Sequence, residues 1–543
     1  MKMRSSTATR HASTRMVIAL LCVVQFVDVL GVTEVLTAAP RILRSLGAGG
    51  GAASAVLTSY AMCFGGLLML AARLGERFGH RRVLLGGIAA FAAGSLCAAT
   101  AGSIPALVAG RCLQGVAAAV SVPASLRLLI AATPSGAERR AAMSAWSAAG
   151  AAAGASGFVI GGALTQLAGW RLMFWVNLPL AAVIAAGVVR AVAAQRPAAS
   201  PELDLRGGLL FSTGIAGIVL GASLLQPPSH AGPGVAAVAG GMMLLGGAAR
   251  VERHTRDPLI PRQALRLRGV RAGAGASFLN TAATSSVAAL ATLDLQRTQH
   301  LSAGAAGVRL LPLSIGAIAG SSLAAPALRR LPARRAIALG LLLIGAADAG
   351  LIPLHRAGWL MSLPIALTGV GLGVSSVAAN AWGTDVGASL QAATAGALNT
   401  TAQLGTALGV ATLLLVSGAT EHASLPLHGP ALGWAGAAVL AVAGAMLITR
   451  WPRPPRQHDD HAAGEEIEAG LGVEQRHQTQ LRGQNAGGDD AEDLAGVLHE
   501  PERREHPPSM AVVSGPLQEA DPGRLHDHAG SAGTHEQGDI QHL

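Results

Sequence analysis

The sequence predicts an all-α integral membrane protein, and three observations support that class. The 543 residues are 51% hydrophobic and only 13% charged, whereas a soluble chain of this size carries about 25% charged residues. Long apolar stretches recur along residues 16–450, with lengths near the roughly 20 residues that a helix needs to cross a bilayer. No stretch alternates with the two-residue period of a transmembrane barrel strand. The spans are therefore expected to be helices.

Fourteen spans are predicted from these apolar stretches. They cover residues 16–38, 54–72, 83–101, 104–131, 141–165, 172–194, 207–225, 233–250, 272–295, 303–327, 336–353, 358–383, 391–417 and 431–449. Because the stretch 233–250 is short, a chain of twelve spans stays open as the alternative.

Arginines between the spans predict the orientation. They gather in the connections 73–82, 139–140, 190–206, 250–268 and 329–335, whereas the alternate connections carry few. Because cytoplasmic loops are enriched in Lys and Arg, this asymmetry places both termini in the cytoplasm and requires an even number of spans. The connection around Asp385 carries no basic residue and departs from the pattern.

An internal repeat predicts two six-helix bundles. RLGERFGHRR at 73–82 follows the second span, and ALRRLPARRA at 327–336 follows the tenth. Matching basic connections are typical of transporters built from repeats. We therefore divide the chain into a cytoplasmic tail 1–15, an N-terminal bundle 16–194, two additional helices 207–250 and a C-terminal bundle 272–449.

The last segment, 451–543, is predicted to be a disordered cytoplasmic tail. It holds 18 of the 30 acidic residues and 7 arginines, a net charge of −11, whereas residues 1–450 carry a net +21. It lacks the apolar periodicity that a core needs. Its His–Asp clusters could bind metal weakly, but a solvated tail is the favoured interpretation, and a shifted reading frame would also produce such a composition.

Several charged side chains lie inside predicted spans. Asp28 and Glu34 interrupt the first span, and Asp348 lies near the middle of the eleventh. An ionised carboxylate at the centre of a membrane helix costs about 2.5–3.5 kcal/mol on insertion scales, so such groups usually serve ion or substrate pathways. Arg111 and Arg309 enter the fourth and tenth spans at similar depths, and four amides add polar groups that could bind substrate or neighbouring helices: Gln114, Asn280, Asn399 and Gln403.

The connection Ala72–Arg82 resembles the gating-loop signature of the major facilitator superfamily. The pattern is carried by six positions: Leu74, Glu76, Arg77, Gly79, Arg81 and Arg82. A glycine permits a tight turn, and an acid can cap a helix N-terminus or pair with an arginine, which would latch two halves together. Ordinary enrichment of basic residues on the cytoplasmic side would explain the arginines but not the glycine and acid spacing.

Further stretches resemble the fourteen-helix drug:proton antiporter branch of that superfamily. They are Arg111–Pro123, the glycine motif Gly150, Gly154, Gly157, Gly161 and Gly162, WRLMFWVNLP at 170–179, ERHTRDPLIP at 252–261 and GALNTTAQLGTALGVA at 396–411. Phe158 stands where the glycine motif usually has proline. Small residues four apart let helices approach closely. The resemblance implies a moving interface between the halves at this row, and static packing is the alternative.

The resemblance also implies that Arg111 takes part in proton coupling, with an outward-snorkelling arginine as the alternative. The family's first-span acid falls on Gly31 here, and Asp28 and Glu34 flank it, each about 60° around the helix. We predict that Asp28 carries the proton and that Glu34 is the partner of Arg111.

These observations predict a proton-coupled secondary transporter that exports a small molecule by alternating access, in the plasma membrane and as a monomer. Phosphate-binding loops of the form G-x-x-x-x-G-K-[ST] are absent, so a proton gradient is the expected energy source, with no cofactor, metal, enzyme activity or nucleic-acid partner. Aromatic residues make up only 3% of the chain, which favours a narrow substrate range. Metabolite uptake and a non-transporting sensor or scaffold with a docking tail are the alternatives.

Overall fold

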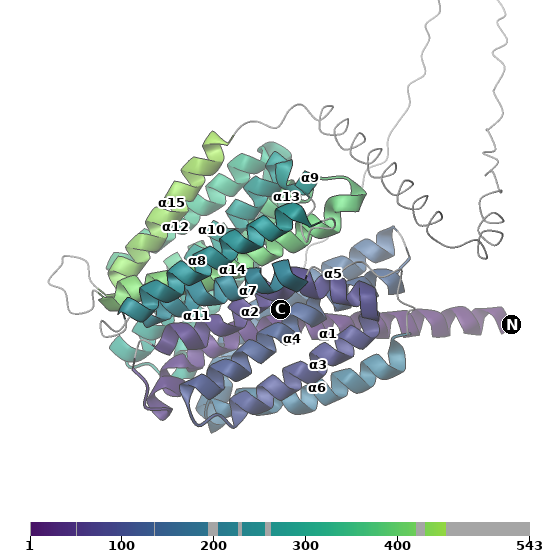
Figure 1. The fold of residues 1–543 in the computed structure, drawn as a ribbon, viewed down its shortest axis with the longest axis horizontal. Coiled ribbons are helices and arrows are strands. Elements are labelled where there is room, and N and C mark those ends of the chain that lie inside the picture. Colours follow the sequence, from purple (N-terminus) through teal and green to yellow (C-terminus); the bar gives the residue numbers. More distant parts are fainter. Residues whose placement is uncertain are drawn as a thin grey trace, which may run out of the picture. The chain divides into compact units, whose positions relative to one another are not determined.

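A computed structural model describes residues 2–49, 52–134, 136–193, 205–225, 231–255, 262–419 and 429–451. These residues belong to one compact unit, Met1–Gly472. The predicted tail lies outside the described residues from 452 onward. Within the described part every regular element is a helix (Figure 1).

The helices follow the predicted spans. They are α1 (Lys2–Ser45), α2 (Ala52–Phe78), α3 (His80–Ala99), α4 (Ile104–Ala132), α5 (Ala137–Ala168), α6 (Arg171–Ala191), α7 (Leu205–Leu224), α8 (Ala231–His254), α9 (Arg262–Arg266), α10 (Arg268–Leu293), the π-helix η2 (Asp294–Thr298), α11 (Ala303–Arg330), α12 (Ala333–Leu354), the 3-10 helix η3 (Gly358–Met361), α13 (Ser362–Gly383), α14 (Ala388–Ala419) and α15 (Pro430–Arg450). α1 begins well before the predicted start at residue 16, and the twelfth predicted span, 358–383, is divided into η3 and α13.

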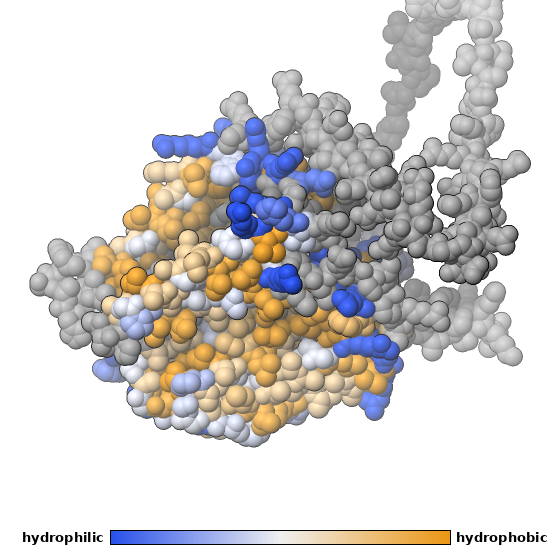
Figure 2. Space-filling model, in the orientation of Figure 1, coloured by the Kyte–Doolittle hydropathy of each residue, from blue (hydrophilic) through white to orange (hydrophobic). Residues whose placement is uncertain are grey.

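Among the described residues, eleven helices are long and apolar enough to cross a membrane, or twelve if α5, which bends by 44° between Ala141–Gly154 and Ser156–Ala168, is one span. α7 is represented by the shorter apolar segment Arg206–Ala222. The count of fourteen spans and the cytoplasmic termini stay predictions. The face seen in Figure 2 is largely apolar, as expected of helices surrounded by lipid.

The same helix pairs recur in the two halves of the chain. In the first half α1 packs on α5, α2 and α3 pack on α4, and α3 packs on α6. In the second half α10 packs on α14, α11 and α12 pack on α13, and α12 packs on α15. Adding nine to each label of the first set therefore gives the second, which is the pattern of a duplicated six-helix unit.

Two symmetric contacts join the halves, α2 with α14 and α5 with α11. α7 packs on α2 and α14, and α8 packs mainly on α7. At the ends predicted to face outward, hydrogen bonds also join the two halves. Gln296 donates from η2 to the Thr37 carbonyl at 2.8 Å, and Ser302 donates to Gln166 Oε1 at 3.3 Å. In this conformation the halves are therefore joined at the ends predicted to face outward.

Candidate functional site

The segment predicted as the gating loop is almost entirely helical. Gly79 alone separates α2 from α3, and its φ of +87° is one that side-chain-bearing residues rarely adopt. Glu76 forms an ion pair with Arg127 of α4 at 3.6 Å, and Arg81 donates to the Val189 carbonyl of α6 at 2.6 Å. Both contacts lie inside the first half, and the latch between the halves stays a prediction.

Gly79→Ala is expected to destabilise the protein by about 1–3 kcal/mol, because a Cβ would be held in a sparsely populated region of φ. Gly86→Ala is the matched control, since Gly86 is helical and a Cβ there would meet no atom within 4 Å. The measurement is the thermal unfolding midpoint of each variant in detergent. Equal midpoints for the two variants would contradict the strain assigned to Gly79.

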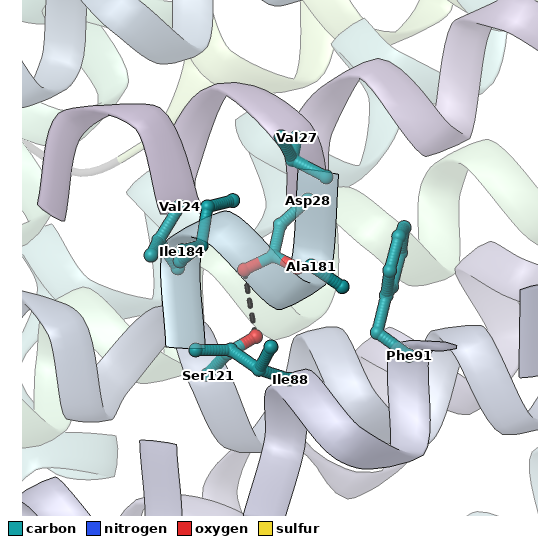
Figure 3. Close-up of a pocket in the computed structure, with 8 residues that line it drawn as sticks. All are labelled: Val24, Val27, Asp28, Ile88, Phe91, Ser121, Ala181 and Ile184. Carbon is teal, nitrogen blue, oxygen red and sulfur yellow. Dashed lines mark hydrogen bonds between the residues drawn. The ribbon is translucent and has the colours of Figure 1, made fainter. Parts of the chain in front are cut away.

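Asp28 lies in a small cavity of about 20 Å³ between α1, α3, α4 and α6. Its side chain is buried, and Ser121 of α4 donates to its Oδ2 at 2.7 Å (Figure 3). Apolar side chains such as Val24 and Phe91 complete the lining. A cavity of this size has room for about one water molecule. Among the described residues no other charged side chain lines it, so Asp28 is a carboxyl group in a largely apolar pocket that receives a hydrogen bond from Ser121.

Glu34 lies on the same helix, beside Arg111 of α4 and Asn177 of α6. Its side chain is 2% exposed, and its Oε1 has no hydrogen-bond partner among the described residues. The charge of Arg111 acts on Glu34, but within the described part of the chain the two form no ion pair at or below 4.0 Å. The predicted partnership is therefore one of neighbouring charges and not of direct contact.

Arg111 instead finds neutral partners. Its Nη2 donates to the Gly31 carbonyl at 2.7 Å, and its Nη1 donates to Gln114 Oε1 at 3.1 Å. Gln114 in turn donates to Ser95 of α3 at 2.8 Å. Arg111 is fully buried, which excludes the interpretation of an arginine that snorkels to the outer surface. Arg111 and Gln114, which were predicted as separate candidates, thus form a hydrogen-bonded unit inside the first half.

The glycine motif of α5 contacts both halves. A Cβ at Gly161 would lie 2.1 Å from the Glu34 carbonyl oxygen, and one at Gly157 would lie 1.9 Å from Thr33 Oγ1. A Cβ at Gly162 would lie 2.5 Å from the Ala303 carbonyl oxygen of α11. Gly150 faces Gln25, whereas Gly154 has nothing within 4 Å. Three of these five glycines therefore let α1 and α11 approach the α5 backbone directly.

The polar candidates of the second half are dispersed. Asn280 donates from α10 to Ser376 Oγ at 2.7 Å, and Arg309 lies over the Trp359 ring at 4.1 Å near η3. Gln403 lies on α14 where α2 crosses it at Gly65, and Asn399 is half-buried one turn earlier. The described contacts of Asn280, Arg309 and Gln403 are thus to three different elements, α13, η3 and α2.

Asp348 has a counterpart in the first half. Gly87 of α3 faces the Ala117 carbonyl and Ser121, and Gly340 of α12 faces the Gly371 carbonyl and Ser375 in the same way. Asp348 lies eight residues after Gly340, as Ser95 lies eight residues after Gly87. Thr368 lies seven residues before Ser375, as Gln114 lies seven residues before Ser121. Thr368 donates to Asp348 at 3.3 Å, as Gln114 donates to Ser95. Asp348 therefore occupies a helix-crossing position between α12 and α13.

Four side chains at the site were not singled out from the sequence: Tyr60, Ser121, Arg127 and Asn177. Tyr60 lies on a span with no distinguishing pattern around it, and Ser121 lies within the Arg111–Pro123 stretch without being one of its matching positions, so only the fold brings them to α1. Asn177 belongs to the WRLMFWVNLP stretch, and an amide inside an apolar span was the signal that could have drawn attention to it.

Comparisons with known proteins agree with this architecture. A family model for the Major Facilitator Superfamily matches residues 21–410. The cephamycin export protein CmcT of Amycolatopsis lactamdurans is 33% identical, over 77% of this chain and 88% of that protein. The puromycin resistance protein pur8 of Streptomyces alboniger is also 33% identical, over 78% of this chain and 88% of that protein.

A solved structure of the peptide transporter POT in complex with sulfate has the same fold, with a TM-score of 0.59 and 17% identity over 80% of this chain and 93% of that chain. At this identity the likeness concerns the fold alone. The duplicated helix pairing, the family match and the two antibiotic-related relatives lead to one conclusion: the chain belongs to the Major Facilitator Superfamily and is a multi-pass membrane transporter.

Proposed function

We propose that the protein exports a small organic compound, of the kind used as an antibiotic, from the cell in exchange for protons. The relatives named above are described as cephamycin export and puromycin resistance proteins. In the proposed cycle, Asp28 takes up the proton, and Arg111 and Glu34 form the charged group beside it. Two halves that contact each other through α5–α11 and α2–α14 then alternate between opposite openings.

One observation carries the coupling part of this proposal. Gly157 and Gly161 of α5 touch α1 at Thr33 and Glu34, and Gly162, the next residue, touches Ala303 of the other half. When an acid on α1 gains or loses a proton, the resulting small displacement of α1 is transmitted through α5, because close-packed backbones transmit strain. The free energy of the contact between α5 and α11 then changes. One helix, α5, therefore contacts both α1, which carries the proposed protonation site, and α11 of the other half.

The bent shape of α5 fits this role. In the part of α5 before Gly154, most described positions are exposed, including Met143. After the bend, Phe158 is buried and its backbone packs on α11 at Gly307. Contact between α5 and α11 is thus made by the second half of α5. Movement of α11 against the glycine motif would separate the two halves at their outer ends and bring them together at their cytoplasmic ends.

Transport in inside-out membrane vesicles tests the proposal. With an acidic lumen, at least one of radiolabelled cephamycin and puromycin is expected to accumulate, and a protonophore is expected to abolish the accumulation. Vesicles that carry the Arg111→Gln variant provide the control. Accumulation only in right-side-out vesicles with acid outside would show uptake and would contradict export.

A further inference from the structure

Tyr60 occupies the centre of the site, although its surroundings in the sequence do not mark it. It is the chain's single tyrosine, lies on α2 and is fully buried. Its hydroxyl donates to the backbone carbonyl of Asp28 at 2.6 Å. The ring packs against Gly31, where a Cβ would lie 3.2 Å from Cε2. Tyr60 therefore fills the space between the two acids of α1.

The same ring holds Arg111. The guanidinium carbon lies 4.7 Å from the ring centroid, within the distance at which an aromatic face attracts a cation. Because Arg111 is fully buried and stays charged, it needs partners inside the protein. The described partners are the Tyr60 ring, the Gly31 carbonyl and Gln114, and none of them is a carboxylate.

We propose that Tyr60 is a positioning residue that holds the Arg111 guanidinium at Gly31 and so keeps it out of ion-pair distance from Asp28 and Glu34. An arginine in direct contact with a carboxylate favours the ionised form of that carboxylate. An acid that must take up a proton in each cycle therefore works against such a contact. With Arg111 bound to neutral groups, both acids stay available for protons while the positive charge stays nearby.

The other titratable groups around this cluster do not replace the ring. The titratable groups whose charges reach Tyr60 are Asp28, Glu34 and Arg111. Cys112 is next to Arg111 in α4 and its free thiol is hydrogen-bonded to the free thiol of Cys63 of α2. Neither thiol offers a charged or aromatic face to the guanidinium. If the ring is removed, Arg111 gains space at Gly31, and the nearest anionic groups that it can reach are the two carboxyl groups of α1.

This inference rests on the proposed proton-coupled export, and Tyr60→Leu tests it in inside-out vesicles as lumenal pH is varied. The pH of half-maximal transport is expected to move toward acid by roughly one unit or more, since an arginine beside a carboxylate lowers its proton affinity by about that much. Tyr60→Phe keeps the ring and is expected to keep the wild-type midpoint. Phe64→Leu is the matched control, because Phe64 packs edge-on against Tyr60 one turn along α2. An unchanged midpoint in Tyr60→Leu would overturn the inference.

A second measurement separates this inference from the proposed function. Thermal unfolding midpoints are compared for wild type, Tyr60→Leu, Arg111→Gln and the double variant. Contact between the two side chains predicts a smaller effect of Tyr60→Leu in the Arg111→Gln background, because residues in contact are non-additive. Additive effects would overturn the contact. Non-additive effects in a protein without proton-driven transport would support the contact and refute the proposed function.

Discussion

Asp28→Asn is expected to abolish proton-driven export while the protein still reaches the membrane in normal amount. The carboxyl group accepts a hydrogen bond from Ser121 in a cavity of about 20 Å³ lined otherwise by apolar side chains. Asparagine fills the same volume and still accepts that bond through its amide oxygen. It cannot exchange a proton, however, so the substitution removes the chemistry and preserves the packing.

The measurement is substrate accumulation in inside-out vesicles, with protein abundance determined on the same membranes. Asp348→Asn is the comparison, since Asp348 is also fully buried but lies between α12 and α13, where it accepts from Thr368. Wild-type export by Asp28→Asn would disprove the role assigned to Asp28. If Asp348→Asn alone abolished export, the proton site would lie in the second half.

Gly161→Ala is expected to impair both stability and transport strongly. Its Cβ would lie 2.1 Å from the Glu34 carbonyl oxygen and 2.8 Å from the Glu34 Cα, and neither backbone atom can move without displacing α1. Overpacking of this kind typically costs about 1–3 kcal/mol. Because the displaced residue is Glu34, transport is expected to fall by more than about tenfold, the rate equivalent of 1.4 kcal/mol.

Gly154→Ala provides the matched control. Gly154 belongs to the same motif on the same helix, but a Cβ there would have no neighbour within 4 Å. We expect wild-type transport and an unfolding midpoint at or slightly above that of wild type, because alanine favours a helix over glycine. If both variants lost transport equally, the glycine motif would be needed for flexibility along its whole length, and not for the close approach of α1 at Gly157 and Gly161.

The different roles of Asp28 and Glu34 on α1 could be predicted only in part from the sequence. The apolar run showed that Asp28 and Glu34 are inside a span, and their spacing placed both about 60° from Gly31. It could not show which neighbours each acid meets. Asp28 turned out to face α3, α4 and α6, whereas Glu34 faces the α5 glycines and lies beside Asn177.

The gating loop shows the same limit. Its glycine, acid and arginines were recognisable from spacing, and the turn at Gly79 was expected. The ion pair of Glu76 with Arg127 depends on where α4 crosses α2, and no local pattern around Arg127 marks it. The described contact of Glu76 therefore lies inside the first half, and a latch between the halves stays a prediction.

The sequence by itself determined the membrane class, the positions of the helices, the family and the presence of buried acids and an arginine. Hydropathy and motif spacing are local properties, so they can be read along one chain. Only the tertiary structure decided that Tyr60 fills the space at Gly31 and that Arg111 is bound by its ring, by Gly31 and by Gln114. These contacts join α1, α2 and α4, and the crossing of three helices is set by packing over the whole bundle and not by the residues at the crossing.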